Sequence, residues 1–105
     1  MNKTNEKFEE IFASCADCSE PSTKFQLNTL KLRCYDLVCH AKTLSEIRRA
    51  IPLIEKGIQV AKGYEVVEGV GHSYGASLAT DIRVDLQDIL ASCWSTIGRK
   101  ILPET

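Results

Sequence analysis

The chain has 105 residues, of which 44% are hydrophobic and 26% are charged, and its formal net charge is −1 at pH 7. This composition is ordinary for a globular protein and argues against extensive disorder. The near-neutral charge gives no overall attraction to nucleic acid or to an anionic membrane. No apolar run approaches the length of a membrane span, and the N-terminal residues have no apolar core of a signal peptide. We therefore expect one cytoplasmic domain over residues 1–105, with neither a membrane nor nucleic acid as a partner.

Two helices are predicted in the first part of the chain. Thr4 is a suitable N-cap for the first helix, which should end at the turn-forming residues 19–22. The apolar stripe of this helix consists of Phe8, Ile11, Phe12 and Cys15. A second helix should follow Ser22 or Thr23 and run to about Ala41. Its main apolar stripe consists of Leu27, Leu30, Cys34, Leu37, Val38 and Ala41.

The second helix has a further apolar stripe on nearly the opposite side. Phe25, Leu32 and Cys39 make up this stripe and recur at a regular spacing along the chain. A helix that is apolar on two sides is either central in its own domain or shared with a second subunit. We predict that these three residues mediate self-association, for which a symmetric dimer is the commonest form. The alternative is that the first or the last helix covers them.

A third helix is predicted to start at Thr43-Leu44-Ser45-Glu46, which is typical of a capping box. Its apolar residues keep one phase on both sides of Pro52, which predicts a kinked but continuous helix. This stripe consists of Ile47, Ala50, Ile51, Ile54, Ile58 and Ala61. The glycines between Gly63 and Gly75 are expected to end the pattern. Residues 64–68 could either prolong the helix or form one short extended segment.

A last helix is predicted from about Ser77 to Ile97, with Gly98 as its C-cap. Its apolar face consists of Leu78, Ile82, Leu86, Ile89, Leu90, Cys93, Trp94 and Ile97. The whole pattern predicts an all-α fold, a four-helix bundle-like single domain with a glycine-rich loop before the last helix.

Charge is distributed unevenly along the chain. Residues 1–20 are mainly acidic and residues 24–49 are mainly basic, so these regions are expected to face each other or a partner of opposite charge. Asp81, Asp85 and Asp88 line one face of the last helix, which we expect to be solvated or to form an acidic docking surface. The basic region lacks the excess charge and the interleaved aromatic residues that are typical of nucleic-acid recognition.

The cysteines favour buried thiols over a metal site or a disulfide framework. Five cysteines form an odd set in a chain without an evident export signal, which is typical of a reducing compartment. Cys15 and Cys18 are spaced like half of a zinc site, but Cys34 and Cys39 are about 140° apart around a helix and cannot both face one metal. We expect core positions for Cys15, Cys34 and Cys93, no metal and no cofactor.

One short motif suggests catalysis. Gly71-His72-Ser73-Tyr74-Gly75 fits the G-x-S-x-G pattern and resembles the nucleophile elbow of the α/β-hydrolases. The resemblance implies a strand over Val66 and Val67 and a nucleophilic Ser73. In that family a histidine follows the serine along the chain, whereas His40 and His72 both precede Ser73. A Ser73-dependent hydrolase is therefore the least favoured of the functions considered.

The same glycine-rich segment could bind an anion or a nucleotide, because it precedes a helix N-terminus. It fits neither the dinucleotide-binding pattern nor the lysine-bearing phosphate loop. Loops on a rigid scaffold often carry function, so any ligand or partner is expected at this segment. The candidate residues are Tyr64, His72, Ser73, Tyr74 and Ser77.

The incomplete catalytic set favours a small non-enzymatic protein that acts by protein–protein interaction, as a regulator, an adaptor or an inhibitor of a larger assembly. Its partner would be another protein, and it would also form a homo-oligomer. The first alternative is an anion- or nucleotide-binding protein that uses residues 69–75 and the start of the last helix.

Overall fold

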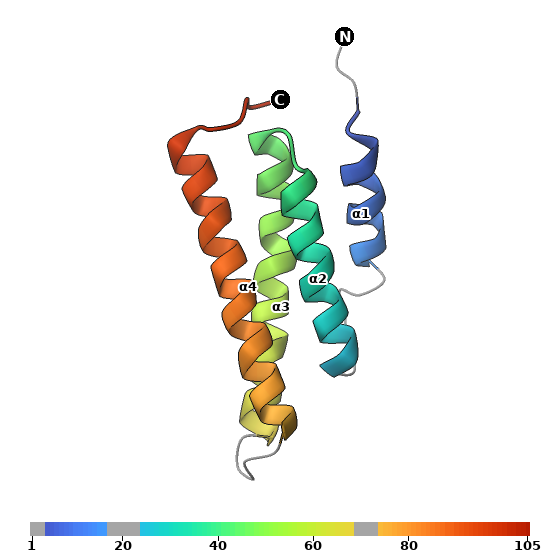
Figure 1. Cartoon of the computed structure of the whole chain (residues 1–105), viewed down its shortest axis with the longest axis vertical. Coiled ribbons are helices and arrows are strands. Elements are labelled where there is room, and N and C mark those ends of the chain that lie inside the picture. Colours follow the sequence, from blue (N-terminus) through green and yellow to red (C-terminus); the bar gives the residue numbers. More distant parts are fainter. Residues whose placement is uncertain (1–3, 17–23, 69–73) are drawn as a thin grey trace.

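The structure is a computed structural model that describes residues 4–16, 24–68 and 74–105, with the backbone alone at residues 16, 24–25, 66–68 and 74–77. These ranges contain no strand and four α-helices: α1 (Glu6–Ala16), α2 (Lys24–His40), α3 (Leu44–Glu68) and α4 (Tyr74–Arg99). α2 and α4 run in one direction, and α1 and α3 run in the opposite direction (Figure 1). The predicted all-α, four-helix bundle-like fold is confirmed.

The helices pack in an open arrangement in which α1 and α4 lie on opposite sides. α2, α3 and α4 pack against one another, and α3 and α4 share the most extensive interface. α1 packs on α2 and, to a smaller extent, on α3 (Figure 1). The core draws on every helix and contains most residues of the predicted main stripes, including Phe8, Leu27, Leu30, Cys34, Leu37, Ile47, Ile54, Ile82, Leu86 and Cys93.

α3 passes through Pro52 as one helix, as its apolar phase predicts. Ile51 and Ile54 flank the proline and are both buried, while Pro52 itself is exposed. A proline cannot donate the hydrogen bond that continues a helix, so the packing of the flanking residues must offset this loss. The helix is therefore held by its buried face as well as by its backbone.

Gly57 marks the closest approach of α3 to its neighbours. A Cβ atom built on Gly57 would lie 3.0 Å from Leu86 Cδ1 and 3.4 Å from Leu30 Cδ2. Two leucines from α4 and α2 therefore occupy the space that a larger residue would need. The absence of a side chain at this position lets three helices converge on one point.

Of the two alternatives for residues 64–68, a prolonged third helix is confirmed, whereas the last helix begins earlier than predicted. α3 continues through Gly63 to Glu68, and α4 begins at Tyr74 instead of near Ser77. A glycine inside a helix costs about 1 kcal/mol relative to alanine, and contacts between α3 and α4 offset this cost. Arg83 of α4 connects to the last part of α3, since its Nε donates a hydrogen bond to Glu65 at 2.8 Å. The alternative of an extended segment over residues 64–68 is wrong.

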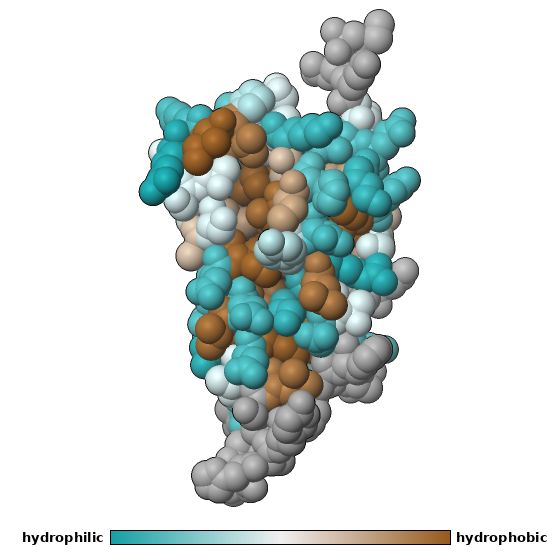
Figure 2. All heavy atoms as spheres, in the orientation of Figure 1, coloured by the Kyte–Doolittle hydropathy of each residue, from teal (hydrophilic) through white to brown (hydrophobic). Residues whose placement is uncertain are grey.

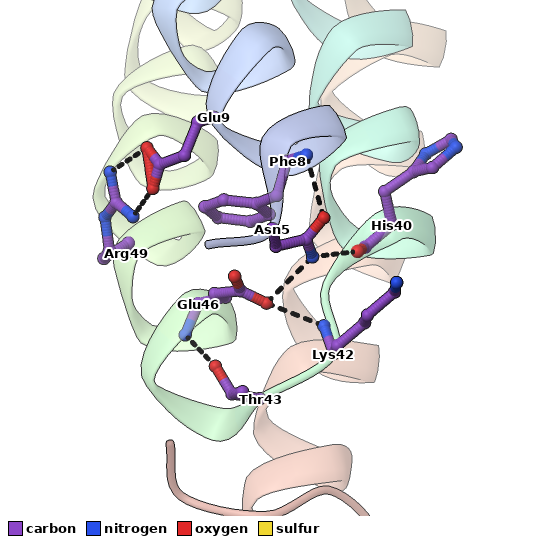
Figure 3. A network of polar contacts seen from close by, with 8 residues as sticks. All are labelled: Asn5, Phe8, Glu9, His40, Lys42, Thr43, Glu46 and Arg49. Atoms are coloured by element: carbon purple, nitrogen blue, oxygen red, sulfur yellow. Dashed lines mark hydrogen bonds and ion pairs between the residues drawn. The ribbon is translucent and has the colours of Figure 1, made fainter. Parts of the chain in front are cut away.

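Asn5, and not Thr4, caps the start of α1. Its Oδ1 accepts a hydrogen bond from the backbone amide of Phe8 at 3.2 Å, which is the geometry of an N-cap (Figure 3). Its Nδ2 donates to the carbonyl of His40 at 2.8 Å, at the end of α2. A threonine hydroxyl could cap a helix, but it could not also provide this amide donor. The second contact therefore explains why Asn5 occupies the cap position.

The start of α3 is built into the same joint. Thr43 Oγ1 accepts from the amide of Glu46 at 3.1 Å, so the N-cap half of the predicted capping box is confirmed (Figure 3), while the Glu46 carboxylate bonds the amide of Lys42 instead of that of Thr43. Glu46 Oε1 accepts from the amide of Lys42 at 2.8 Å and from Asn5 Nδ2 at 3.2 Å. One carboxylate thus joins the starts of α1 and α3 and the connection from α2.

The residues after α4 cap α3 as well. The amide of Leu44 donates to the carbonyl of Pro103 at 2.7 Å, and the amide of Ser45 donates to the carbonyl of Glu104 at 3.1 Å. The chain crosses from the end of α4 to the start of α3 to reach these positions (Figure 1). Arg48 then pairs with the Glu104 carboxylate through hydrogen bonds of 2.6 and 3.1 Å. Two amides that a helix start leaves unpaired are satisfied in this way.

The end of α4 departs from the prediction in two ways. Lys100, and not Gly98, adopts the left-handed conformation of a C-cap, with φ of 51°. The amide of Ile101 donates to the carbonyl of Thr96 at 3.4 Å and that of Lys100 to the carbonyl of Ile97 at 3.2 Å, which is a Schellman motif. Trp94 is 54% exposed, because it lies at the edge of the apolar stripe, about 100° around the helix from the next core position.

Arg49 clamps α1 onto α3. Its guanidinium lies over the ring of Phe12, 4.3 Å from the centroid, and over that of Phe8, 5.3 Å from the centroid. The same guanidinium pairs with the carboxylate of Glu9 through two hydrogen bonds (Figure 3). An acidic residue of the first region therefore faces a basic residue of the second, as the charge distribution predicts.

The two arginine–glutamate pairs predict a loss of stability in acid. Hydrogen bonds from Arg49 hold the pKa of Glu9 below its usual value near 4.5, and those from Arg48 do the same for Glu104. A pKa that is lowered by folding gives stability that is present above the unfolded-state value and is lost as the pH falls through the folded-state value. We expect the Tm to fall as the pH is lowered from 5 to 3.

Thermal unfolding followed by circular dichroism measures this effect. In a Glu9→Gln, Glu104→Gln double variant, the fall in Tm should be smaller than in the native protein. Glu55→Gln is the matched control, because Glu55 is exposed and has no hydrogen bond within the described residues. An identical acid dependence of native protein and double variant would contradict the prediction.

Candidate protein-binding face

The predicted glycine-rich site is largely outside the described part of the chain. His72 and Ser73 lie outside the described residues, and Tyr74 and Ser77 are described only as backbone in the first turns of α4. Tyr64 is half-buried and packs against the core. Val66 and Val67 belong to α3, so the strand that a nucleophile elbow requires is replaced by a helix. Of the five candidates, Tyr64 alone has a side chain among the described residues.

The second stripe of α2, by contrast, is open to solvent where it is described. Leu32 is 55% exposed and Cys39 is exposed as well. Phe25 belongs to α2, but its side chain lies outside the described residues. α1 and α4 pack on either side of this stripe without covering it, so the alternative that one of them buries Leu32 and Cys39 is wrong.

An open groove runs beside this stripe, between α2 and α4. Two adjoining hollows of about 290 and 350 Å³ form the groove and share Tyr35, Asp88 and Ile89. The remaining lining residues are Lys31, Leu32, Val38, Cys39, Asp85 and Ser92. We refer to these nine residues as the α2–α4 face. Figure 2 shows hydrophobic side chains gathered along the seam between the two helices, with hydrophilic side chains on both flanks.

Aromatic and aliphatic side chains dominate the exposed part of the face. Tyr35 is 59% exposed and lies between Leu32 and Cys39 along α2, while Ile89 of α4 is half-buried below them. Tyrosine contributes more than its share of binding energy in protein interfaces, because it presents a large rigid surface with a polar end. The face therefore has the composition of an interface centre.

The charged residues of the face lie mainly on its α4 side. Lys31 Nζ lies 3.2 Å from Asp85 Oδ2 and joins α2 to α4 across the groove. Asp81 and Asp88 are exposed and have no ion-pair partner within the described residues. The predicted acidic row is thus solvated, but two of its members also border an apolar groove.

Sequence reasoning did not identify Tyr35, Asp88 or Ile89 as parts of one site. Tyr35 falls between Leu32 and Cys39 at helical spacing, and this pattern could have extended the second stripe. Ile89 was assigned to the core stripe of the last helix. Only the packing of α4 beside α2 shows that this residue also forms the floor of a groove.

A larger hollow of about 590 Å³ lies at the joint between α1 and α3. Its polar lining residues include Asn5, Thr43 and Glu46, which already bond to each other or to the backbone. These side chains stabilise the helix starts, so the hollow belongs to the scaffold. Within the described residues, no three His, Cys, Asp or Glu side chains are grouped so that they could hold a metal ion.

The described cysteines are predicted to differ strongly in reactivity. Cys15, Cys34 and Cys93 are buried, and burial raises the pKa of Cys93 to about 11, whereas Cys39 is exposed. Because the thiolate is the reactive form, a buried neutral thiol reacts only after local opening. In a Cys18→Ser background we expect one thiol to react rapidly with a chromogenic disulfide at pH 8 and three to react at least about a hundredfold more slowly.

Replacing Cys39 by serine in that background should remove the rapid phase and leave the slow phase unchanged. Mass spectrometry of the modified protein identifies the labelled residue. Rapid labelling of Cys34 or Cys93 in the folded protein would contradict the assigned core.

The chain matches no known family model, and no curated protein or solved structure is significantly similar to it. No helix in the described ranges combines the length and the apolar character that are needed to cross a membrane.

Proposed function

We propose that this protein acts without catalysis, by binding protein through the α2–α4 face. The observation that carries this proposal is the exposure of Leu32 and Tyr35, at 55% and 59%, beside the half-buried Ile89 on one continuous groove. Burial of a leucine side chain alone contributes about 1.5 to 3 kcal/mol. A partner that covers these residues would gain this energy, which the isolated chain leaves unused.

The arrangement of the face favours a helical partner. Two parallel helices border a long open groove, and such a groove accepts an amphipathic helix by its apolar side. The exposed carboxylates of Asp81 and Asp88 would attract basic residues on the flank of that helix. A regulator, an adaptor or an inhibitor can act in this way, because its function requires binding alone.

The proposal is tested by comparing two variants that place the same charge on different surfaces. Leu32→Glu changes the α2–α4 face, and Val84→Glu changes an exposed hydrophobic residue of α4 that does not line the groove. Affinity purification from an extract of the source cells, quantified by mass spectrometry, should show the same bound proteins for native protein and Val84→Glu. The bound proteins should decrease at least about tenfold with Leu32→Glu, since a charge is placed in an apolar contact.

Both variants should retain the native melting temperature within a few degrees, because both replaced side chains are solvent-exposed. Equal recovery of bound proteins by both variants would exclude the α2–α4 face as the binding surface. Turnover of an ester substrate that Ser73→Ala abolishes would instead support the hydrolase alternative.

A further inference from the structure

Charge changes sign along the groove side of α4. Asp81, Asp85 and Asp88 occupy its first half, and Arg99 lies at its last residue. Arg99 comes seven residues, or about two turns, after Ser92, so the two residues lie on the same side of α4. Ser92 lines the groove, and Arg99 therefore lies on the groove side as well. Arg99 is exposed and has no ion-pair partner within the described residues. This side of α4 is therefore acidic at one end and basic at the other.

The acidic and the basic end of α4 are separated by a whole number of helical turns. Asp81 and Arg99 are 18 residues apart, which is about five turns or 27 Å, and they therefore share one face of α4. The midpoint of α4 between Asp81 and Arg99 lies next to Ile89, which lines both hollows of the groove. The apolar centre of the face thus lies midway between an acidic end and a basic end.

We infer that the partner on the α2–α4 face is a second copy of this chain, an inference that rests on the proposed function. A two-fold axis through the centre of the groove, perpendicular to the helices, would place α4 antiparallel to α4 of the second copy. Asp81 of each copy then faces Arg99 of the other, and Tyr35 and Leu32 meet the same residues of the second copy near the axis. The contact is isologous, because one surface meets itself.

Opposite charges select this arrangement over the parallel one. A two-fold axis parallel to the helices would place the basic ends of the two copies at the same end of the interface. The two acidic ends would then lie together at the other end. Like charges would then meet at both ends of the interface, which is unfavourable. In the antiparallel arrangement Asp81 and Arg99 form two symmetric pairs, and Leu32, Tyr35 and Ile89 are removed from water. The Asp88 carboxylates of the two copies come near each other at the axis, which offsets part of this gain.

Charge reversal tests both the second copy and its orientation. In Asp81→Arg each end of the dimer would hold two arginines, and in Arg99→Asp each end would hold two aspartates. The dissociation constant of either variant should rise about ten- to thirtyfold, since two favourable contacts become unfavourable ones. An equimolar mixture of the two variants should recover the native constant, because the mixed dimer has one opposite-charge pair at each end.

Sedimentation velocity at protein concentrations from 1 µM to 1 mM measures these constants. Glu55→Arg is the matched charge-reversal control that should leave the constant unchanged, because Glu55 is exposed on α3 and α3 does not contribute to the α2–α4 face. Melting temperatures confirm that the variants are folded. A native protein that stays monomeric over this range overturns the inference. A dimer that neither variant weakens, or that the mixture does not restore, overturns it as well. If the native chain is monomeric and Leu32→Glu still loses bound proteins from the extract, the proposed function stands and its partner is a different protein.

Discussion

Phe8→Ala is expected to lower the free energy of unfolding by about 3 to 5 kcal/mol, the range that is typical for removal of a buried phenylalanine. Phe8 is fully buried and belongs to the core, although α1 contributes only 11 residues to the fold. Its ring also stacks on that of Phe12, with the centroids 6.0 Å apart, and lies under the Arg49 guanidinium. Truncation therefore leaves a cavity and weakens the clamp that holds α1 on α3.

Urea unfolding followed by circular dichroism at 222 nm gives the free energy, and Lys7→Ala is the matched control on the same helix. Lys7 is exposed, and its ion pair within the described residues is a long contact of 3.9 Å with Glu10, so its loss should change the free energy by less than about 0.5 kcal/mol. A Phe8→Ala protein within 1 kcal/mol of the native value would show that α1 contributes little to the core.

Deletion of residues 102–105 is expected to cost about 2 to 3 kcal/mol. The deletion removes two backbone acceptors from the start of α3, each worth about 1 kcal/mol, and the partly buried side chain of Leu102. It also removes the pair between Arg48 and Glu104, which is exposed and contributes little. The amides of Leu44 and Ser45 would then have to find water as their acceptor.

Glu104→Ala separates the two causes, because it keeps the carbonyl that accepts from Ser45 and removes only the carboxylate. We expect it to cost much less than the deletion in the same urea experiment, because an exposed ion pair contributes little to stability. If Glu104→Ala costs as much as the deletion, the ion pair and not the backbone cap provides the stability. Amide hydrogen exchange at Leu44 and Ser45 should increase in the deletion variant and stay native in Glu104→Ala.

The helices and the core could be predicted from the sequence because both depend on a local period. Leu27, Leu30 and Leu37 of α2 and Ile47 and Ile54 of α3 recur at helical spacing, and all are buried. The phase across Pro52 gave a continuous helix for the same reason. These residues lie close in sequence, so their spacing along the chain is enough to predict which side of each helix is apolar.

The ends of the helices could not be predicted in this way, because distant residues decide them. Asn5 caps α1 while it bonds a carbonyl at the end of α2, and this second contact is invisible in the local pattern. Gly63 stays helical although glycine favours a break, because Tyr64 packs against the core and Glu65 bonds to Arg83 of α4. Lys100 takes the left-handed position that Gly98 would suit better, as the chain turns toward the start of α3.

One part of the binding face could likewise be predicted from the sequence, and the rest depends on the tertiary structure. The sequence by itself determined that α2 is apolar on two sides, but it left open whether a neighbouring helix covers Leu32 and Cys39. The packing of α1 and α4 decided this, because each helix lies beside the second stripe and neither lies over it. The groove also joins residues such as Lys31 and Asp85, which are 54 positions apart and meet only when α4 packs along α2. A periodic pattern reports which side of a helix is apolar, and only the positions of the other helices determine which apolar side stays exposed to a partner.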